Sequence, residues 1–366
     1  MKKIFIVAGE PSGDLHAARL MRELKNVLPG VEFTGIGGEN MEREGLQSLV
    51  ALKEISVVGF WEVAKKYSFF KKLLKECGEL LKTGGFDAFI PVDYPGFNMR
   101  LAAQAKLLKI PVIFYIAPQL WAWGENRAKK LAAVVDKLLV VFPFEVEFFK
   151  KFGIDTEFVG HPLLDDPAFK NGFKNVSERE NRVAFLPGSR RQEVLKHLPI
   201  MEETARILLK EIPDIQFSVA QSRNLPDEIF KNSFKNLPVT FEKDSRALMQ
   251  KSRVGLVKTG TSTLEAALCG MPFAMMYKTS PVSYHLSKYL VTLDAIALPN
   301  ILLKRKVVPE LIQQGATPEI IARELLKIMR DEEIAFKMQE DFGELRRLLG
   351  EEGASRRAAE VIKSGM

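Results

Sequence analysis

Residues 4–14 have the sequence Ile-Phe-Ile-Val-Ala-Gly-Glu-Pro-Ser-Gly-Asp. The first five residues are apolar and predict a buried strand, and the other six predict a tight turn at the start of a helix. Leu15, Ala18 and Met21 then recur at helical spacing. Such a turn collects free backbone N–H groups and the positive end of a helix, which favours an anion or a sugar hydroxyl. Its spacing does not match Gly-x-Gly-x-x-Gly, so no dinucleotide-binding fingerprint is predicted.

A second segment repeats this design about 175 residues later. Residues 183–186 are apolar, and Pro-Gly-Ser-Arg-Arg-Gln-Glu follows at 187–193. The pattern again predicts a strand, a Gly-Ser turn and a helix. A chain of 366 residues with 46% apolar content is long enough to form two cores. We therefore expect two nucleotide-binding-type domains that face each other.

Apolar runs alternate with helical patterns along the chain, which is typical of α/β proteins with doubly wound parallel sheets. The runs lie at residues 4–8, 33–36, 86–92, 111–116, 137–141, 157–159, 183–186, 215–220, 239–241, 254–257 and 272–276. Two prolines and several polar residues at 160–167 interrupt the alternation, as a hinge would. We predict an N-terminal domain at 1–165 and a second domain at 166–334. Charged helices at 335–366 are expected to return to an N-terminal domain, either of this chain or of a partner in a homodimer.

Composition limits the classes of partner. The formal net charge of +7 and the pI of about 9.1 favour an anionic partner, which leaves phosphate, nucleic acid and anionic lipid open. Cys77 and Cys269 are far apart in apolar surroundings, so neither a disulfide framework nor a metal cluster is predicted, and a reducing cytoplasm fits. No stretch approaches 18 apolar residues, so any membrane contact is expected to be peripheral. No Asp-x-Asp pair is available to hold a divalent ion on a diphosphate, so a metal-independent reaction is expected if the substrate is a nucleotide diphosphate.

Ligands of open parallel sheets lie beyond the carboxyl ends of the strands, where Asp93 and Tyr277 are expected. Asp93 lies between an apolar run and a turn, where desolvation would raise its pKa and make it a usable base. Alternatively, Asp93 caps the helix that we expect to begin near Asn98. The sequence leaves both interpretations open.

Phosphate- and ribose-binding side chains are expected in the second half. Thr261 and Ser262 follow a strand at a predicted helix start, and Glu265 lies one turn later, where its carboxylate is able to accept both hydroxyls of a ribose. Arg190 in the earlier Gly-Ser turn is a permanent cation that suits a phosphate. Alternatively, the hydroxyl residues at 261–262 only cap a helix, and Arg190 is an ordinary surface arginine.

Residues 60–82 predict a strongly apolar helix face that six lysines and three glutamates surround. An interfacial helix on anionic lipid has this pattern, but so does a helix that packs on the core of an α/β domain. Trp121 and Trp123 either belong to the core or line an acceptor groove. The predicted acceptor or membrane residues are Phe60, Trp61, Val63, Tyr67, Phe70, Leu74, Trp121 and Trp123.

Seven segments together resemble one family. They are Ala-Gly-Glu-Pro-Ser-Gly-Asp at 8–14, Gly-Ile-Gly-Gly at 35–38, Asp-Tyr-Pro-Gly-Phe-Asn at 93–98, Pro-Gln-Leu-Trp-Ala-Trp at 118–123, Leu-Pro-Gly-Ser-Arg at 186–190, Gly-Thr-Ser-Thr-Leu-Glu at 260–265 and Leu-Pro-Asn at 298–300. Their residues and order are similar to those of lipid-A-disaccharide synthase. The combination is specific, although many two-domain glycosyltransferases share the Thr-Leu-Glu element alone.

The resemblance implies a GT-B glycosyltransferase that inverts the anomeric carbon and requires neither metal nor cofactor. UDP-2,3-diacylglucosamine would be the donor and 2,3-diacylglucosamine 1-phosphate (lipid X) the acceptor, giving the β-1,6-linked disaccharide 1-phosphate and UDP. Asp93 matches the family's essential aspartate and would be the base. The residues expected at the nucleotide sugar are Ser12, Gly13, Gly188, Ser189, Arg190, Gly260, Thr261, Ser262, Glu265, Tyr277, Asn300 and Gln313.

The resemblance also implies a location, because both substrates carry acyl chains. It favours the interfacial interpretation of residues 60–82 and a peripheral protein on the cytoplasmic face of the inner membrane. A UDP-sugar 2-epimerase of the same fold remains an alternative. A basic nucleic-acid-binding protein is another alternative. In such a protein, lysines and arginines alternate with aromatic residues that stack on bases, whereas the lysines of residues 60–82 surround an apolar face. No nucleic-acid partner is therefore expected.

Overall fold

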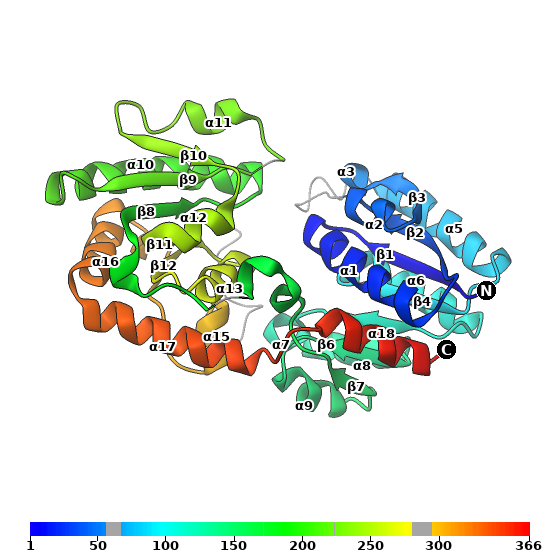
Figure 1. The fold of residues 1–366 in the computed structure, drawn as a ribbon. Helices are drawn as coiled ribbons and strands as arrows, with labels where there is room; N and C mark the ends of the chain where they lie inside the picture. The colour runs from blue at the N-terminus through cyan, green and yellow to red at the C-terminus, as the bar shows by residue number, and fades with distance from the viewer. Residues whose placement is uncertain (56–66, 171, 223, 280–294) are drawn as a thin grey trace. The chain divides into compact units, whose positions relative to one another are not determined.

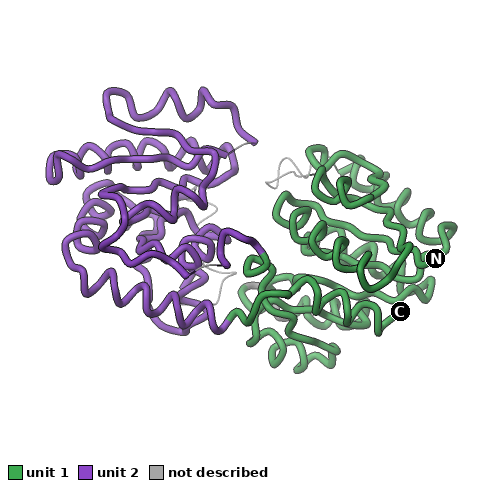
Figure 2. Tube along the Cα trace, viewed as in Figure 1, with its two compact units in different colours: residues 1–165, 349–366 green, residues 166–348 purple. Residues whose placement is uncertain are grey.

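The computed structural model describes residues 1–55, 67–170, 172–222, 224–279 and 295–366. The chain forms two compact units (Figure 2). Unit 1 contains residues 1–165 and 349–366, and unit 2 contains residues 166–348. Each unit has a parallel β-sheet covered by helices, which confirms the predicted α/β class (Figure 1).

The sheet of unit 1 has the strand order β3-β2-β1-β4-β5-β6-β7. Its strands are β1 (Lys3–Ala8), β2 (Glu32–Gly37), β3 (Leu46–Ala51), β4 (Ala88–Val92), β5 (Ile113–Tyr115), β6 (Lys137–Val140) and β7 (Thr156–Phe158). The order reverses between β1 and β4, which pair in parallel with Ala8 opposite Val92. The carboxyl ends of these two strands therefore lie side by side at the switch point where open α/β sheets bind ligands.

The helices of unit 1 bury apolar residues against both faces of its sheet. They are α1 (Pro11–Val27), α2 (Glu39–Arg43), α3 (Leu52–Ile55), α5 (Tyr67–Thr83), α6 (Pro95–Leu107), α7 (Leu120–Trp123), α8 (Glu125–Ala132), α9 (Phe144–Lys150) and α18 (Ala354–Ser364). Alternate residues of β1 enter different clusters: Phe5 packs with residues of α5, α6 and α8, and Ile6 with residues of α1 and α18. This alternation follows from the two-residue period of a strand.

α18 brings the end of the chain back to unit 1. It lies beside α1 (Figure 1) and buries Ala358, Ala359 and Ile362 there. The returning segment begins at residue 349, so the predicted start at 335 is wrong. The preceding helix α17 (Glu332–Leu348) belongs to unit 2, because it packs on α13 and α16.

Unit 2 has the strand order β10-β9-β8-β11-β12-β13. The strands are β8 (Glu180–Leu186), β9 (Gln216–Ala220), β10 (Val239–Glu242), β11 (Ser252–Lys258), β12 (Phe273–Tyr277) and β13 (Glu310–Ile312). Val183 and Phe185 on β8 are fully buried, as expected for a central strand with helices on both faces. The helices are α10 (Arg191–Glu211), α11 (Asp227–Lys231), α12 (Ser245–Lys251), α13 (Thr261–Leu268), α15 (Leu298–Leu303), α16 (Pro318–Arg330) and α17.

The structure describes α5 as a helix that packs on unit 1. Leu73, Cys77 and Leu81 are buried at a four-residue spacing, as the core alternative for residues 60–82 predicted. Phe70 and Leu74 are half-buried against the same cluster, and Tyr67 is 61% exposed. Phe60, Trp61 and Val63 lie outside the described residues. Among the helices that the structure describes, none is long and apolar enough to cross a membrane.

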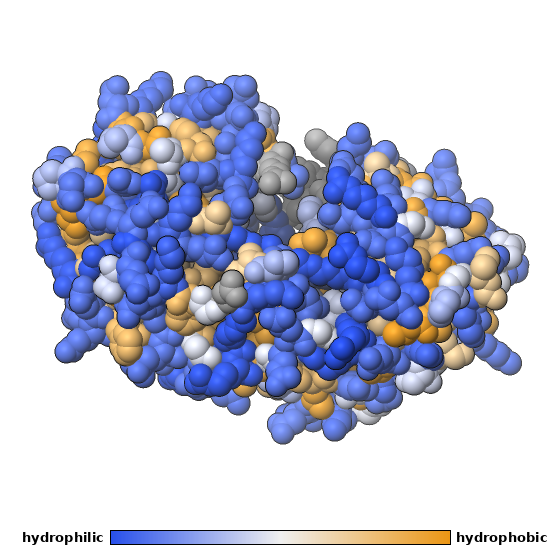
Figure 3. Space-filling view, in the orientation of Figure 1, coloured by the Kyte–Doolittle hydropathy of each residue, from blue (hydrophilic) through white to orange (hydrophobic). Residues whose placement is uncertain are grey.

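The surfaces of both units are mixed. On the face that Figure 3 shows, apolar side chains occur in small groups among hydrophilic ones. Over the described residues, the exposed large apolar side chains lie on several elements, with two neighbours at the end of α6; they are Met1, Leu49, Tyr67, Leu107, Leu108, Leu195 and Phe336. A few exposed apolar residues are ordinary on a protein surface.

Candidate active site

The turn after β1 presents the N-terminus of α1. The helix begins at Pro11, and Glu10 stands at its cap position without a side-chain capping bond. Ser12 is exposed and Gly13 is buried. The first amides of a helix have no intrahelical acceptor, and anion binding at this end of α1 stays a prediction. This end lies at the carboxyl edge of the unit 1 sheet.

Asp14 fixes the shape of this turn, a role that the sequence analysis did not assign. Its buried carboxylate accepts hydrogen bonds from the backbone N–H of Gly38 at 2.7 Å and of Met41 at 3.1 Å, and from Asn40 Nδ2 at 2.7 Å. Asp14 therefore ties α1 to the start of α2. No local pattern in the sequence marks this role, because it depends on donors that the fold brings to Asp14 from the start of α2.

Asp93 stands directly after β4, beside the end of β1. Its φ angle is 47° and that of Tyr94 is 52°, so two consecutive non-glycine residues are left-handed. α6 begins at Pro95 without a side-chain capping bond, so the capping interpretation of Asp93 is wrong. A Cβ atom on Gly9 would lie 2.3 Å from the Tyr94 ring, which explains why the turn after β1 has glycine there.

Burial raises the pKa of Asp93 to about 6, and the nearby Glu10 carboxylate adds to this rise. Asn98 supports the strained backbone, because its Nδ2 donates to Asp93 O at 2.7 Å and to Val7 O at 3.3 Å. The Asp93 N–H donates to Tyr115 O at 3.2 Å. Strain of this kind persists only where neighbouring groups enforce it, and it is concentrated at functional sites. Asp93 therefore has a fixed backbone and a partly desolvated carboxylate, which makes it a candidate base.

Trp121 is packed into unit 1 at the ends of β5 and β6. Its indole N–H donates to Glu145 Oε1 at 2.9 Å, and its ring packs edge-on against Phe144 and Phe142. Glu145 is fully enclosed; its Oε2 accepts the N–H groups of Val141 and Phe142, and burial raises its pKa to about 7. Trp121 is half-buried and anchors the loop after β5. The side chain of Trp123 lies outside what the structure describes.

In unit 2, the Gly-Ser turn after β8 begins α10. Gly188 has a φ angle of 105°, which favours glycine, and Arg190 is the cap residue. The Arg190 side chain is 44% exposed, and its Nη1 lies 3.6 Å from Glu193 Oε1. His197 holds the turn: its Nδ1 contacts Pro187 O at 2.8 Å, its Nε2 accepts the Lys278 N–H at 3.4 Å, and burial lowers its pKa.

The neighbouring strand β11 leads into α13 through Gly260, whose φ angle is 118°. Thr261 is exposed and Ser262 is half-buried at the first turn of this helix. Glu265 Oε1 lies 3.0 Å from Arg246 Nη2, and Arg246 also pairs with Asp166. The ion pair fixes the orientation of Glu265, the predicted ribose acceptor.

The next two strands of the unit 2 sheet, β12 and β13, also end in predicted site residues. Tyr277 ends β12. Gln313 follows β13 with a φ angle of 51°; its Oε1 accepts the Thr279 N–H at 3.4 Å, and its buried Nε2 has no hydrogen-bond partner among the described residues. A buried amide donor of this kind is suited to a ligand oxygen.

Asn300 has a different position from the one expected. It is 4% exposed, and its amide bonds lie inside unit 2. Nδ2 donates to Val308 O and Glu310 Oε1, and Oδ1 accepts the N–H groups of Val307 and Val308. These four bonds use the whole capacity of an amide. Asn300 therefore shapes the segment before β13 and has no hydrogen bond left for UDP.

Within each unit, the parallel order brings the predicted residues together. β8, β11, β12 and β13 are consecutive neighbours, so their carboxyl ends place Arg190, Gly260, Tyr277 and Gln313 along one edge of unit 2. β1 and β4 bring the Ser12–Gly13 turn beside Asp93 in unit 1. No group of three or more metal-ligating side chains occurs within the described ranges.

The model of the Lipid-A-disaccharide synthetase family matches residues 4–364. The chain belongs to this family. A lipid-A-disaccharide synthase of Sulfurihydrogenibium sp. is 36% identical, with 100% of this chain and 98% of that protein covered. These matches confirm the resemblance and the predicted glycosyltransferase class.

Solved structures show the fold. The UDP-GlcNAc 2-epimerase from Neisseria meningitidis, solved with UDP-GlcNAc bound, has a TM-score of 0.64 and 13% identity, covering 100% of this chain and 99% of that chain. The calicheamicin glycosyltransferase CalG4 also has a TM-score of 0.64 and 13% identity, covering 100% and 98%. The predicted GT-B fold is thereby confirmed. Identities this low say nothing about which reaction the family member catalyses.

Proposed function

We propose that this family member transfers 2,3-diacylglucosamine from UDP to the 6-hydroxyl of 2,3-diacylglucosamine 1-phosphate. The products are the β-1,6-linked disaccharide 1-phosphate and UDP. The observation that carries the proposal is Asp93: a strained, half-buried carboxylate beside the start of α1, in a chain that matches this family over residues 4–364.

Asp93 is the base in this proposal. With a pKa near 6 it is mostly ionised at neutral pH, yet it holds a proton more tightly than an exposed aspartate does. It takes the proton of the acceptor 6-hydroxyl while that oxygen attacks the anomeric carbon. UDP leaves from the opposite face, so the configuration at the anomeric carbon is inverted.

Unit 2 holds the donor in this proposal. Arg190 and the N-terminus of α10 neutralise charge that develops on the diphosphate, which removes the need for a metal ion. The Gln313 amide offers its free donor, and Glu265 accepts the ribose hydroxyls with Oε2. Gly188, Ser189, Gly260, Thr261, Ser262 and Tyr277 form the remaining wall of the donor site in unit 2. In unit 1, the amides of Ser12 and Gly13 at the start of α1 are proposed as further phosphate-binding groups.

The acyl chains of both substrates place the reaction at a membrane surface. We propose peripheral attachment to the cytoplasmic face of the inner membrane, with Tyr67 and the lysines of α5 facing lipid. Tyr67 is exposed, and Lys71, Lys72 and Lys75 on the same helix are exposed as well. Lysines near anionic lipid each contribute about 1 kcal/mol to membrane attraction.

The test supplies the purified protein with both lipids in EDTA. Disaccharide and UDP are expected, and Asp93→Ala is expected to lose about 10²- to 10⁴-fold in turnover while it still binds UDP. Asp155→Ala, which removes an exposed carboxyl of unit 1, is the control and should keep its turnover.

Full turnover in Asp93→Ala would contradict the base assignment, and failure of wild type to form disaccharide would contradict the function. Incubation with UDP-GlcNAc alone tests the epimerase alternative, because an epimerase would invert C2 without an acceptor lipid.

A further inference from the structure

Lys258 occupies a central position at the carboxyl edge of unit 2. It is the last residue of β11, and its side chain is 15% exposed. Its Nζ lies 3.0 Å from Glu193 Oε2 and 5.9 Å from the centre of the Tyr277 ring. The ammonium group thus stands among three of the elements that form the proposed nucleotide site.

Two glycine turns lie beside the Lys258 side chain. A Cβ atom on Gly188 would lie 3.4 Å from Lys258 Cδ, and one on Gly260 would lie 3.9 Å from Lys258 Nζ. Both glycines have positive φ angles, so each turn exposes its backbone beside the lysine rather than a side chain. Turns with exposed amides next to a cation are suited to phosphate oxygens.

Glu193 connects this lysine to Arg190. One carboxylate oxygen faces Lys258 Nζ at 3.0 Å, and the other faces Arg190 Nη1 at 3.6 Å. The nearby His197 adds no further positive charge at neutral pH, because burial lowers its pKa. A single carboxylate therefore lies between the two cations that a diphosphate would contact.

We propose that Lys258 is a second diphosphate-binding cation beside Arg190, and that the Glu193 carboxylate pairs with both cations until a nucleoside diphosphate binds and takes its place. This inference rests on the proposed use of a UDP-linked donor. Charge-assisted hydrogen bonds to phosphate are stronger than those between neutral groups. The ion pair with Glu193 keeps Lys258 oriented before the ligand arrives.

The test compares UDP and uridine binding by calorimetry. Lys258→Met is expected to weaken UDP binding about 10- to 100-fold and to change uridine binding less than about twofold, because uridine has no phosphate. Lys258→Arg should retain most of the UDP affinity. Lys251→Met, which removes an exposed lysine at the end of α12, is the matched control and should bind UDP as wild type does.

Glu193→Gln separates this proposal from a purely structural ion pair. If the carboxylate competes with the diphosphate, its removal should tighten UDP binding by about two- to fivefold at low salt. If the pair only holds the turn in place, Glu193→Gln should weaken UDP binding as Lys258→Met does, and that result would overturn the proposal.

Three further outcomes are decisive. Unchanged UDP affinity in Lys258→Met, or an equal loss for UDP and uridine, contradicts the inference. Failure of the wild-type protein to bind UDP instead contradicts the proposed function. Circular dichroism of each variant checks folding, and if Lys258→Met does not fold, the sign of the Glu193→Gln effect still decides the question.

Discussion

Asp93 is held ionised at neutral pH in surroundings that disfavour its charge. Burial and the Glu10 carboxylate raise its pKa from the ordinary 3.8 to about 6, and its backbone is left-handed. A shift of about two pKa units corresponds to about 3 kcal/mol of differential interaction between the two protonation states. The residue that carries the proposed chemistry therefore reduces the stability of unit 1.

We predict that Asp93→Asn stabilises the protein at pH 8 by up to about 3 kcal/mol, because it removes the buried charge. The folded pKa exceeds the unfolded one, so the cost of the charge is complete above about pH 6 and disappears below about pH 4. Urea unfolding at both pH values measures this difference.

Asp214→Asn alters an exposed aspartate and is the control. Its free energy of unfolding should stay within about 0.5 kcal/mol of wild type. A gain for Asp93→Asn that is equally large at pH 4 would contradict the electrostatic cause.

Turnover of the wild-type protein should also rise with pH through about 6, since only the ionised carboxylate accepts a proton.

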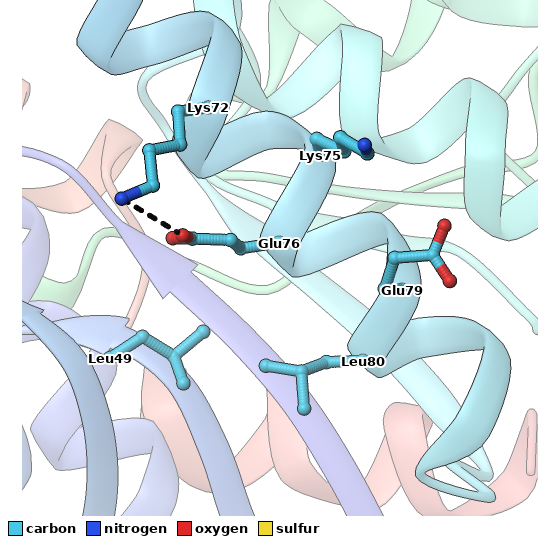
Figure 4. A pocket seen from close by; sticks show the side chains of 6 residues that line it. All are labelled: Leu49, Lys72, Lys75, Glu76, Glu79 and Leu80. Carbon is cyan, nitrogen blue, oxygen red and sulfur yellow. Dashed lines mark ion pairs between the residues drawn. The ribbon is translucent and has the colours of Figure 1, made fainter.

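Among the elements, α5 has one buried face and one exposed face. Leu73, Cys77 and Leu81 face the core, whereas Tyr67 is exposed. A hollow of about 600 Å³ lies between α5 and the edge strand β3 (Figure 4). Its lining residues are Leu49, Lys72, Lys75, Glu76, Glu79 and Leu80. One face of α5 therefore packs on the core, and the opposite face exposes an aromatic residue and lysines.

We predict that Tyr67→Glu lowers binding to anionic vesicles about 5- to 10-fold and leaves the melting temperature unchanged. The change replaces an interfacial aromatic residue with a negative charge that anionic lipid repels. Vesicle sedimentation measures the binding. Leu107→Glu places the same charge on another exposed apolar site of unit 1 and should bind vesicles normally. Equal binding by both variants would exclude α5 as the lipid-facing helix.

The edge strands β3 and β13 are the elements that the hydrophobic pattern missed. β3 alternates between covered and exposed residues, and β13 has only three residues. Edge strands have a neighbour on one side only, so they need no continuous apolar run of the kind that identified β1, β4 and β8.

At the scale of the whole molecule, the chain passes from unit 1 to unit 2 after Asp165 and returns before residue 349. Asp165 stabilises the return: its carboxylate accepts the N–H groups of Gly353 and Ala354 at 2.6 and 3.0 Å, and that of Ser355 at 2.9 Å. Residues nearly 190 positions apart therefore close unit 1 at the start of α18.

We predict that Asp165→Ala weakens the protection of α18 amides by about 0.5–2 kcal/mol, because the start of the helix loses its capping carboxylate. Hydrogen exchange measured peptide by peptide reports this effect. Asp331→Ala removes the matching cap of α17, where Asp331 accepts the N–H groups of Glu333 and Ile334. The control should loosen α17 and leave α18 unchanged, and the same response in both helices would contradict separate units.

Local patterns in the sequence determined the two-domain α/β class, most strands and the turns at residues 9–14 and 187–193, because buried strands and Gly-Ser turns depend on neighbouring residues. The family followed from motifs that the sequence contains complete. Only tertiary structure decided that Asp93 lies half-buried near Glu10 rather than at a helix cap, and that Asn300 is buried. It also decided that Lys258 pairs with Glu193 and that α17 belongs to unit 2. Burial, pairing and pKa depend on groups brought together from distant positions, and no local pattern records them.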